Sequence, residues 1–182
     1  MTQVGHTLTG AALGVLCTPP SASLKWKTVY SVAFALLANV PDLPFRNWGH
    51  DRYDISHSIF VNLLLIMVVV IALSFWRNAR RRIGGWGVVA GGAIAWLSHL
   101  LLDSFYNHGW GIAIFWPVSE ARLALPIPWF SVLSSPPPLT SQVLLVCLVE
   151  FVCYFPLLLL TIGLKESSAV RRLFKGILKS GV

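Results

Sequence analysis

Residues 57–103 have the sequence HSIFVNLLLIMVVVIALSFWRNARRRIGGWGVVAGGAIAWLSHLLLD, and this stretch decides the fold. It holds two apolar runs, residues 57–76 and 84–102, which are joined by a short segment containing four arginines. A helix that crosses the hydrocarbon core of a bilayer needs about 20 predominantly apolar residues, and both runs reach that length. The stretch therefore predicts two membrane-spanning helices that run in opposite directions.

Three further apolar runs flank this pair. Residues 140–163 form a long run that is interrupted by Glu150 and Pro156. Residues 8–17 and 26–40 form two shorter runs, each near the lower length limit for a span. With these runs included, the sequence predicts an all-α fold, a polytopic transmembrane bundle of about four to five helices.

The composition supports a membrane protein. Of the 182 residues, 55% are hydrophobic and 12% are charged, whereas about 25% are charged in a typical soluble domain. The net charge of +7 comes mainly from basic clusters beside the apolar runs, as in cytoplasmic loops, and no nucleic-acid-binding motif accompanies it. The predicted partner is therefore the membrane lipid bilayer and not nucleic acid.

Two other segments divide the chain into regions. Residues 110–138 are rich in Pro, Trp and Phe, which predicts an irregular loop at the membrane interface. Residues 165–182 are basic and carry apolar residues at helical spacing, which predicts an amphipathic tail on the cytoplasmic surface. Residues 1–164 are then the membrane-embedded domain.

The basic clusters also predict the orientation of the runs. Because basic loops stay on the cytoplasmic side, the arginines of residues 77–82 and the basic tail lie there, and the other ends of these runs face outward. Ionisable residues occupy those outer ends: Asp42, His57, His99 and Asp103, with His6 added if residues 8–17 also cross. Ionisable groups at membrane depth are costly unless they are paired or bind an ion, so the set is a candidate functional site.

The residue types in this set suit a divalent metal. His99 and Asp103 are four residues apart, which places both on one face of a helix. Imidazole and carboxylate ligands suit zinc, with manganese as the second choice. We predict one metal site with His6, Asp42, His57, His99 and Asp103 as ligands. A hydrogen-bonded His–Asp pair without a metal is the alternative.

Three residues outside this set are further candidates. His108 is expected to contact a second ion or the substrate, or to lie in a solvated loop. Arg52 is expected to meet an anionic group such as phosphate, or to pair with Asp51 or Asp54. Glu150 lies near the middle of its apolar run, so we expect a structural hydrogen bond to a neighbouring helix, far from the outer cluster.

Short motifs are spread in order over about the first two-thirds of the chain: Gly5-His6-Thr7, Pro41-Asp42, Ser56-His57-Ser58, His99-Leu-Leu-Leu-Asp103, Gly109 and Trp116-Pro117. Together they resemble the membrane-bound metal-dependent hydrolase family, also described as the YdjM-like inner membrane proteins. The resemblance implies a multi-pass protein of the inner membrane with a metal-dependent hydrolytic activity.

The expected function is hydrolysis of an ester or phosphoester, on a lipid-like or other small-molecule substrate, at the outer face of the membrane. Asp42 is expected to be the catalytic base or a metal ligand, since a carboxylate beside the metal can take a proton from the attacking water. Two alternatives remain open. A structural metal site would be closed by four protein ligands. A small-solute transporter would show inverted repeats and polar residues along several spans, and the sequence has neither feature.

Overall fold

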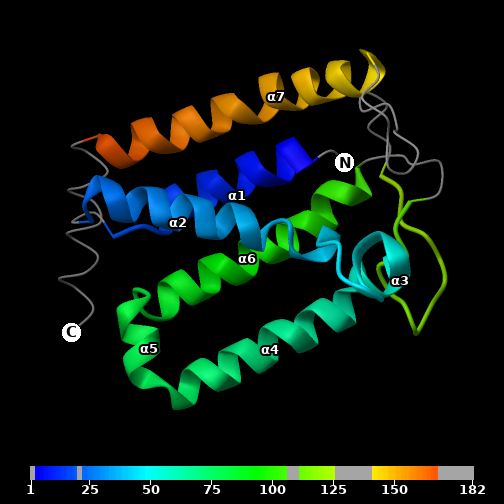
Figure 1. Ribbon diagram of the computed structural model, residues 1–182, viewed down its shortest axis with the longest axis horizontal. Coiled ribbons are helices and arrows are strands. Elements are labelled where there is room, and N and C mark those ends of the chain that lie inside the picture. Colours follow the sequence, from blue (N-terminus) through cyan, green and yellow to red (C-terminus); the bar gives the residue numbers. More distant parts are fainter. Residues whose placement is uncertain (1–2, 20–21, 106–110, 126–140, 168–182) are drawn as a thin grey trace.

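The computed structural model of the protein describes residues 3–19, 22–105, 111–125 and 141–167, and these residues are mostly helical (Figure 1). The described elements are α1 (Gln3–Cys17), α2 (Leu24–Leu37), η1 (Val40–Asp42), η2 (Gly49–Arg52), α3 (Tyr53–Ser56), α4 (Ile59–Phe75), α5 (Arg77–Arg82), α6 (Trp86–Ser104) and α7 (Ser141–Glu166). Within these residues the only β-type pairing is an isolated bridge between Ile112 and Leu123. The all-α prediction is confirmed.

Two of the described helices are long and apolar enough to cross a membrane, α6 over Trp86–Ser104 and α7 over Val143–Glu166. This is fewer than the four to five spans predicted, because α1, α2 and α4 have 15, 14 and 17 residues. α4 is shorter than the predicted run 57–76 because Ser58 caps its first turn, with the Ser58 side chain accepting a hydrogen bond from the Val61 amide. The cap leaves His57 in a turn in front of the helix.

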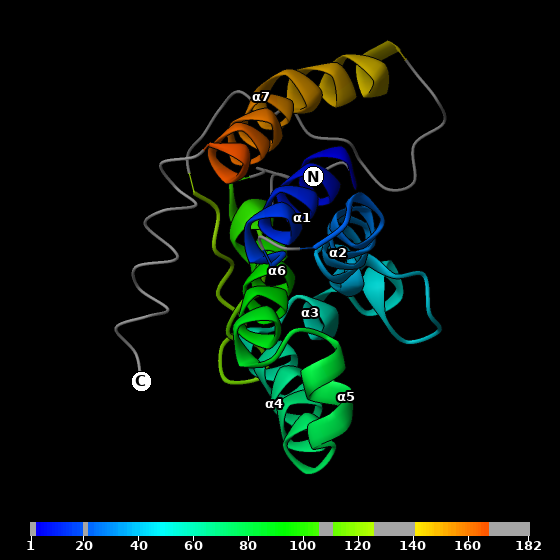
Figure 2. The same cartoon turned by 90° about the vertical axis from the view of Figure 1, so that its left-hand side faces the viewer.

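The first two helices pack closely through two glycines of α1. A Cβ atom on Gly10 would lie 2.5 Å from the Phe34 carbonyl oxygen, and one on Gly14 would lie 2.7 Å from the Tyr30 carbonyl oxygen. This spacing of four residues lets the backbones of α1 and α2 approach directly, as small residues do between membrane helices. α7 lies across α1 on the side away from α4 (Figures 1 and 2).

The ends of the helices gather at two opposite ends of the bundle (Figure 1). At one end, α2 and α6 finish and α4 begins. At the other end lie α5, the start of α2 and the finish of α7, where the Lys27 side chain pairs with Glu166 and the Lys165 ammonium donates to the Leu16 carbonyl at 2.6 Å. Lys165 and Glu166 form the end of α7, residues 168–182 lie outside the described residues, and the predicted amphipathic tail stays a prediction.

The described part of the Trp- and Pro-rich segment, residues 111–125, lies at the first of these ends. The Ile59 amide at the start of α4 donates to the Ile114 carbonyl at 2.8 Å, and the Leu125 amide donates to the Ser104 carbonyl at the end of α6 at 2.6 Å. The segment therefore joins α4 to α6 where the ionisable residues gather. Residues 126–138 of the predicted interfacial loop lie outside the described residues.

Candidate metal centre

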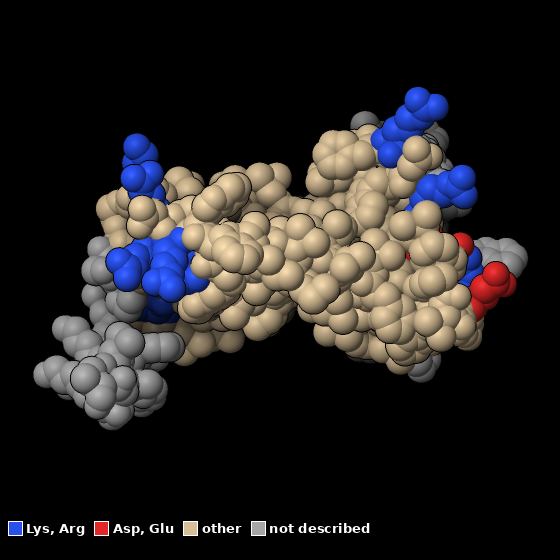
Figure 3. Space-filling view, turned by 90° about the horizontal axis from the view of Figure 1, so that it is seen from below, with Lys and Arg blue, Asp and Glu red and all other residues tan. Residues whose placement is uncertain are grey.

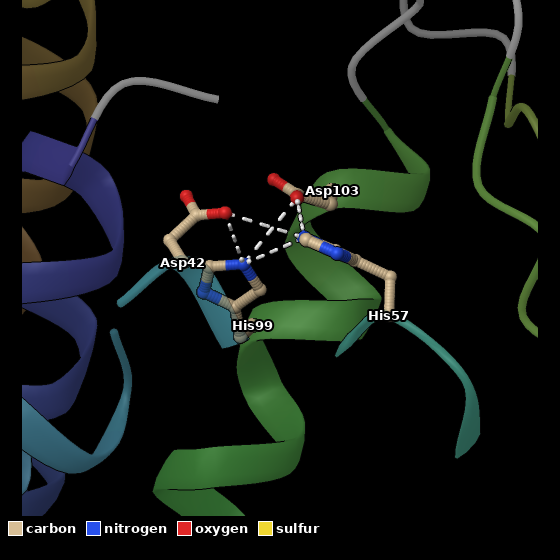
Figure 4. Close-up of side chains that lie close together, drawn as sticks. All are labelled: Asp42, His57, His99 and Asp103. Atoms are coloured by element: carbon tan, nitrogen blue, oxygen red, sulfur yellow. Dashed lines mark hydrogen bonds and ion pairs between the residues drawn. The ribbon is translucent and has the colours of Figure 1, made fainter. Parts of the chain in front are cut away.

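Four side chains from three separate parts of the chain converge on one point (Figure 4). Asp42 comes from η1, His57 from the turn between α3 and α4, and His99 and Asp103 from the last turns of α6. Each offers one ligand atom, these four atoms all lie within 4.8 Å of one another, and all four residues are buried. The structure therefore brings together four of the five residues that the sequence predicts as metal ligands.

The distances between these ligand atoms are short and similar. His57 Nε2 lies 3.1 Å from Asp103 Oδ2, 3.4 Å from Asp42 Oδ1 and 3.2 Å from His99 Nε2. His99 Nε2 lies 3.4 Å from Asp103 Oδ2 and 3.7 Å from Asp42 Oδ1. Ligand atoms at 2.0–2.1 Å from a tetrahedral zinc ion would be about 3.3–3.4 Å apart. The observed separations centre on this value, so the cluster fits a small divalent cation.

The second nitrogen of each imidazole fixes which nitrogen faces the centre. His99 Nδ1 donates to the Ala38 carbonyl at 2.8 Å, and His57 Nδ1 donates to the Tyr53 carbonyl at 3.1 Å. Because a carbonyl oxygen only accepts, both Nδ1 atoms carry hydrogen, so Nε2 is the nitrogen of each ring that faces the cluster and would bind a metal. Metal-binding histidines are oriented by backbone carbonyls in this way.

Once the Nε2 proton of each ring is lost, two imidazole lone pairs and two carboxylate oxygens are all hydrogen-bond acceptors. Four acceptors this close, with five of their six separations at 3.1–3.7 Å, repel one another unless positive charge lies among them. A single proton lies along the line between two atoms, whereas a metal ion at the centre meets all four. The donor set and its shape therefore favour a cation over a simple His–Asp hydrogen bond.

The charges of the cluster residues also favour a bound cation. Burial would raise the pKa of Asp42, but the hydrogen bond from His57 and the charge of His99 hold this pKa at about 2, so the carboxylate stays ionised. Burial would lower the pKa of His57, but its hydrogen bonds with Asp103 and Asp42 raise it to about 9. The two carboxylates thus stabilise positive charge where the ligand atoms meet.

His6 lies beside the four convergent residues and contacts Asp103 on the side away from the other three. Its Nε2 donates to Asp103 Oδ1 at 3.1 Å, and its ring stacks on the His99 ring with centroids 3.8 Å apart. Oδ1 is the Asp103 oxygen that faces away from the other ligands, since Oδ2 is the atom near His57 and His99. In this position His6 orients Asp103, and its role as a direct ligand stays a prediction.

Sequence reasoning missed Asn62 and Trp96, which hold the turn that carries His57. Asn62 is fully buried and donates to the carbonyls of Ser56 and Ser58 at 2.7 and 2.8 Å, on either side of His57. Its Oδ1 accepts from Trp96 Nε1 of α6 at 2.7 Å. A lone asparagine in the run IFVNLLL is a signal that could have identified Asn62, because a buried amide among apolar residues needs hydrogen-bond partners.

Tyr53 is a further contact of the cluster that the sequence did not indicate. Its ring stacks on His57 with centroids 3.8 Å apart, and its hydroxyl lies 3.4 Å from Asp103 Oδ2. Burial, together with the charges of Asp103 and Asp42, raises the pKa of Tyr53, so the phenol keeps its proton and acts as a donor. No motif in the sequence marks this residue, which begins the short helix α3.

Glu150 forms the predicted structural hydrogen bond. Its Oε2 accepts from the Gly5 amide at 3.0 Å, which satisfies one of the unpaired N–H groups in the first turn of α1 and places a negative charge at the positive end of that helix. The expectation that Glu150 lies far from the cluster is wrong, because α1 begins at Gln3 and Gly5 directly precedes His6.

The remaining candidates lie outside the cluster. Arg52 is exposed, and Asp54 pairs with Arg122 at 2.9 Å, so the predicted pairing of Arg52 with Asp54 is not formed. His108 lies outside the described residues. The contacts predicted for Arg52 with an anion and for His108 with a second ion or substrate stay predictions.

The fold and the cluster together define an all-helical protein with a buried His/Asp group suited to a metal ion. The model of the family described as YdjM inner membrane protein matches residues 1–164, and the chain belongs to this family. The family predicted from the short motifs is thus confirmed, while the hydrolytic activity implied by the resemblance stays a prediction. Among curated proteins and solved structures, nothing matches the chain.

Proposed function

We propose that this protein is a membrane-embedded, metal-dependent hydrolase that acts on an ester or phosphoester at the outer face of the inner membrane. One observation carries the proposal: two Nε2 lone pairs and two carboxylate oxygens from three segments converge at the separations expected around a divalent cation. Zinc is the metal we expect, because two imidazoles and two carboxylates suit it, and manganese is the second choice.

His57, His99 and Asp103 would hold the cation. Their ligand atoms are 3.1–3.4 Å apart, closer than the 3.7 Å between Asp42 and His99. Catalytic zinc sites have three protein ligands and one position for water or substrate. Asp42, at 8% exposure, is the most accessible of the four side chains and supplies the carboxylate at that fourth position.

A bound divalent cation would supply the Lewis acidity that activates a water and polarises the ester. Asp42 is ionised and would accept the proton of the attacking water as general base. His6 holds Asp103 by its outer oxygen, and Tyr53 donates toward the inner one, so both residues keep Asp103 in place for the reaction.

We also propose that four to five of the helices cross the membrane, with the basic end in the cytoplasm. The support is the distribution of charge: on the face seen in Figure 3, lysines, arginines and acids gather at the two ends and the middle is free of them. α2 and α4 also expose large apolar side chains, including Val32, Leu64 and Val68. A lipid-like substrate would then reach the cluster from the outer leaflet.

A structural metal site in a non-catalytic protein is the second candidate. The observation that favours it is that all four ligand residues are buried and that four protein ligands complete a tetrahedron. The two functions differ in what Asp42 does. In a hydrolase it is needed for turnover, whereas in a structural site it contributes only to metal affinity and stability.

The experiment compares metal content and hydrolysis in the purified full-length protein. We expect about one equivalent of metal in the wild type, a large loss in His99→Ala, and little change in the matched variant Ser98→Ala on the same turn. In a screen of lipid and phosphate esters, Asp42→Asn should lose about 10²–10⁴-fold in turnover. The control Asp54→Asn removes an exposed carboxylate that pairs with Arg122 and should keep its activity. Metal binding without any turnover in the wild type would support the structural site instead.

A further inference from the structure

An apolar cavity lies between α2, α4 and α6, apart from the candidate metal centre. Its volume is about 440 Å³, within the range of about 300–1,000 Å³ for ligand pockets. Its walls are apolar and come from all three helices, with Phe34 on α2, Val70 on α4 and Val88 on α6 as representatives. Protein interiors leave few voids larger than a water molecule, so a space of this size between packed helices is a candidate ligand site.

This cavity is separated from the metal cluster. Trp96 lines it at the end toward the cluster, and the Trp96 indole is held there by its hydrogen bond to Asn62. None of the four cluster residues contributes to its walls. Whatever occupies the cavity is therefore not the group that the metal cluster would hydrolyse.

The other end of the cavity is basic. Arg82 contributes to its lining, and the Arg80 guanidinium lies 4.5 Å from the centre of the Trp86 ring at the same end of α6. Among the described residues at this end the acid is Glu166, which is already paired with Lys27. A ligand that fills the cavity thus meets hydrocarbon along its length and positive charge at one end.

We infer that the cavity binds one acyl chain of an anionic phospholipid, whose phosphate meets Arg82. The volume corresponds to roughly 15 groups the size of a water molecule at ~30 Å³ each, and methylene groups are of similar size, so one acyl chain fits. Basic residues at a membrane surface attract anionic headgroups, and a guanidinium can bind two phosphate oxygens at once. Arg82 lies at the basic end of the bundle, so with the orientation proposed above the lipid comes from the cytoplasmic leaflet, opposite to the metal cluster.

The test uses the full-length protein in mild detergent, incubated with equal amounts of palmitoyl-oleoyl phosphatidylglycerol and phosphatidylcholine and examined by native mass spectrometry. The wild type should retain one phosphatidylglycerol, with about fivefold preference over phosphatidylcholine. Arg82→Gln should bring this ratio to about one, and the matched variant Arg81→Gln, which does not line the cavity, should keep it.

A second pair of variants tests the cavity itself. Ala93 lines the cavity and Ala90 is exposed on the same helix, so Ala93→Phe should lose the retained lipid and Ala90→Phe should keep it. Leu73→Trp fills the space from the α4 side and replaces Ala93→Phe if circular dichroism shows that the latter is not folded. Equal retention of the two lipids by the wild type, retention of phosphatidylglycerol in the filled variants, or a lipid-free dimer would overturn the inference.

Discussion

Asn62→Leu is the substitution that most directly tests how the candidate metal centre is held together. The Asn62 side chain joins the turn that carries His57 to the helix that carries His99 and Asp103. It donates to the two carbonyls that flank His57 and accepts from the Trp96 indole. Leucine has a similar volume and cannot make any of these bonds, so the change removes the connection without opening a cavity.

The expected magnitude follows from these three hydrogen bonds. An unsatisfied buried polar group costs about 1–3 kcal/mol in soluble proteins, while hydrogen bonds between membrane helices average about 0.6 kcal/mol. Between these limits, Asn62→Leu should lower the free energy of unfolding by about 2–5 kcal/mol. Because the His57 turn loses its support, metal affinity should also fall by about 10–100-fold, as it does when residues that orient metal ligands are replaced.

The assay is zinc competition with a chromophoric chelator, together with thermal unfolding of the detergent-solubilised protein with and without added zinc. Ser74→Leu is the control, since the exposed Ser74 side chain bonds only to the Val70 carbonyl of its own helix. It should keep the affinity of the wild type. An Asn62→Leu protein that folds and binds zinc as tightly as the wild type would refute the view that this amide positions His57.

Three further predictions concern the cluster and its surroundings. Since the pKa of His57 is raised to about 9, this ring is protonated at neutral pH and must lose a proton to bind metal. Zinc affinity should therefore rise about tenfold per pH unit between about pH 6.5 and 8.5. A flat profile of affinity against pH in chelator titrations would contradict this. His6→Phe keeps the aromatic stack and removes the N–H that holds Asp103, so zinc affinity should fall by about 10–100-fold, whereas complete loss of metal would identify His6 as a direct ligand. Gly10→Leu places a side chain where a Cβ already lies 2.5 Å from the backbone of α2 and should cost at least about 1–3 kcal/mol in thermal unfolding, while the control Gly163→Leu meets open space and should cost little.

Several features of the site could be predicted because they depend only on spacing along the chain. The four-residue spacing of His99 and Asp103 puts both on one face of a helix wherever that helix lies. The alternation of apolar runs and basic loops placed Asp42 and His57 at the same end of the bundle as that pair, and the structure brings all four together. Each of these inferences needs only the period of a helix and the order of the runs.

Other predictions failed where local caps and turns matter. Ser58 caps the first turn of α4, so the helix begins only at Ile59 and is shorter than its apolar stretch. α1 extends back to Gln3, which brings Glu150 next to the residue that precedes His6. Hydropathy averages over many residues, so it does not resolve where the first hydrogen-bonded turn of a helix begins.

The sequence by itself determined the helical class, the family and the residue types that gather at one end of the bundle, because hydrophobic periodicity and charge act over whole segments. Only the tertiary structure decided which atoms meet. Hydrogen bonds from Nδ1 of His57 and His99 to the carbonyls of Tyr53 and Ala38 orient both Nε2 atoms toward the cluster. His6 contacts the outer oxygen of Asp103. These choices depend on separations of a few ångströms between segments far apart in the chain, which are fixed by packing and by backbone hydrogen bonds.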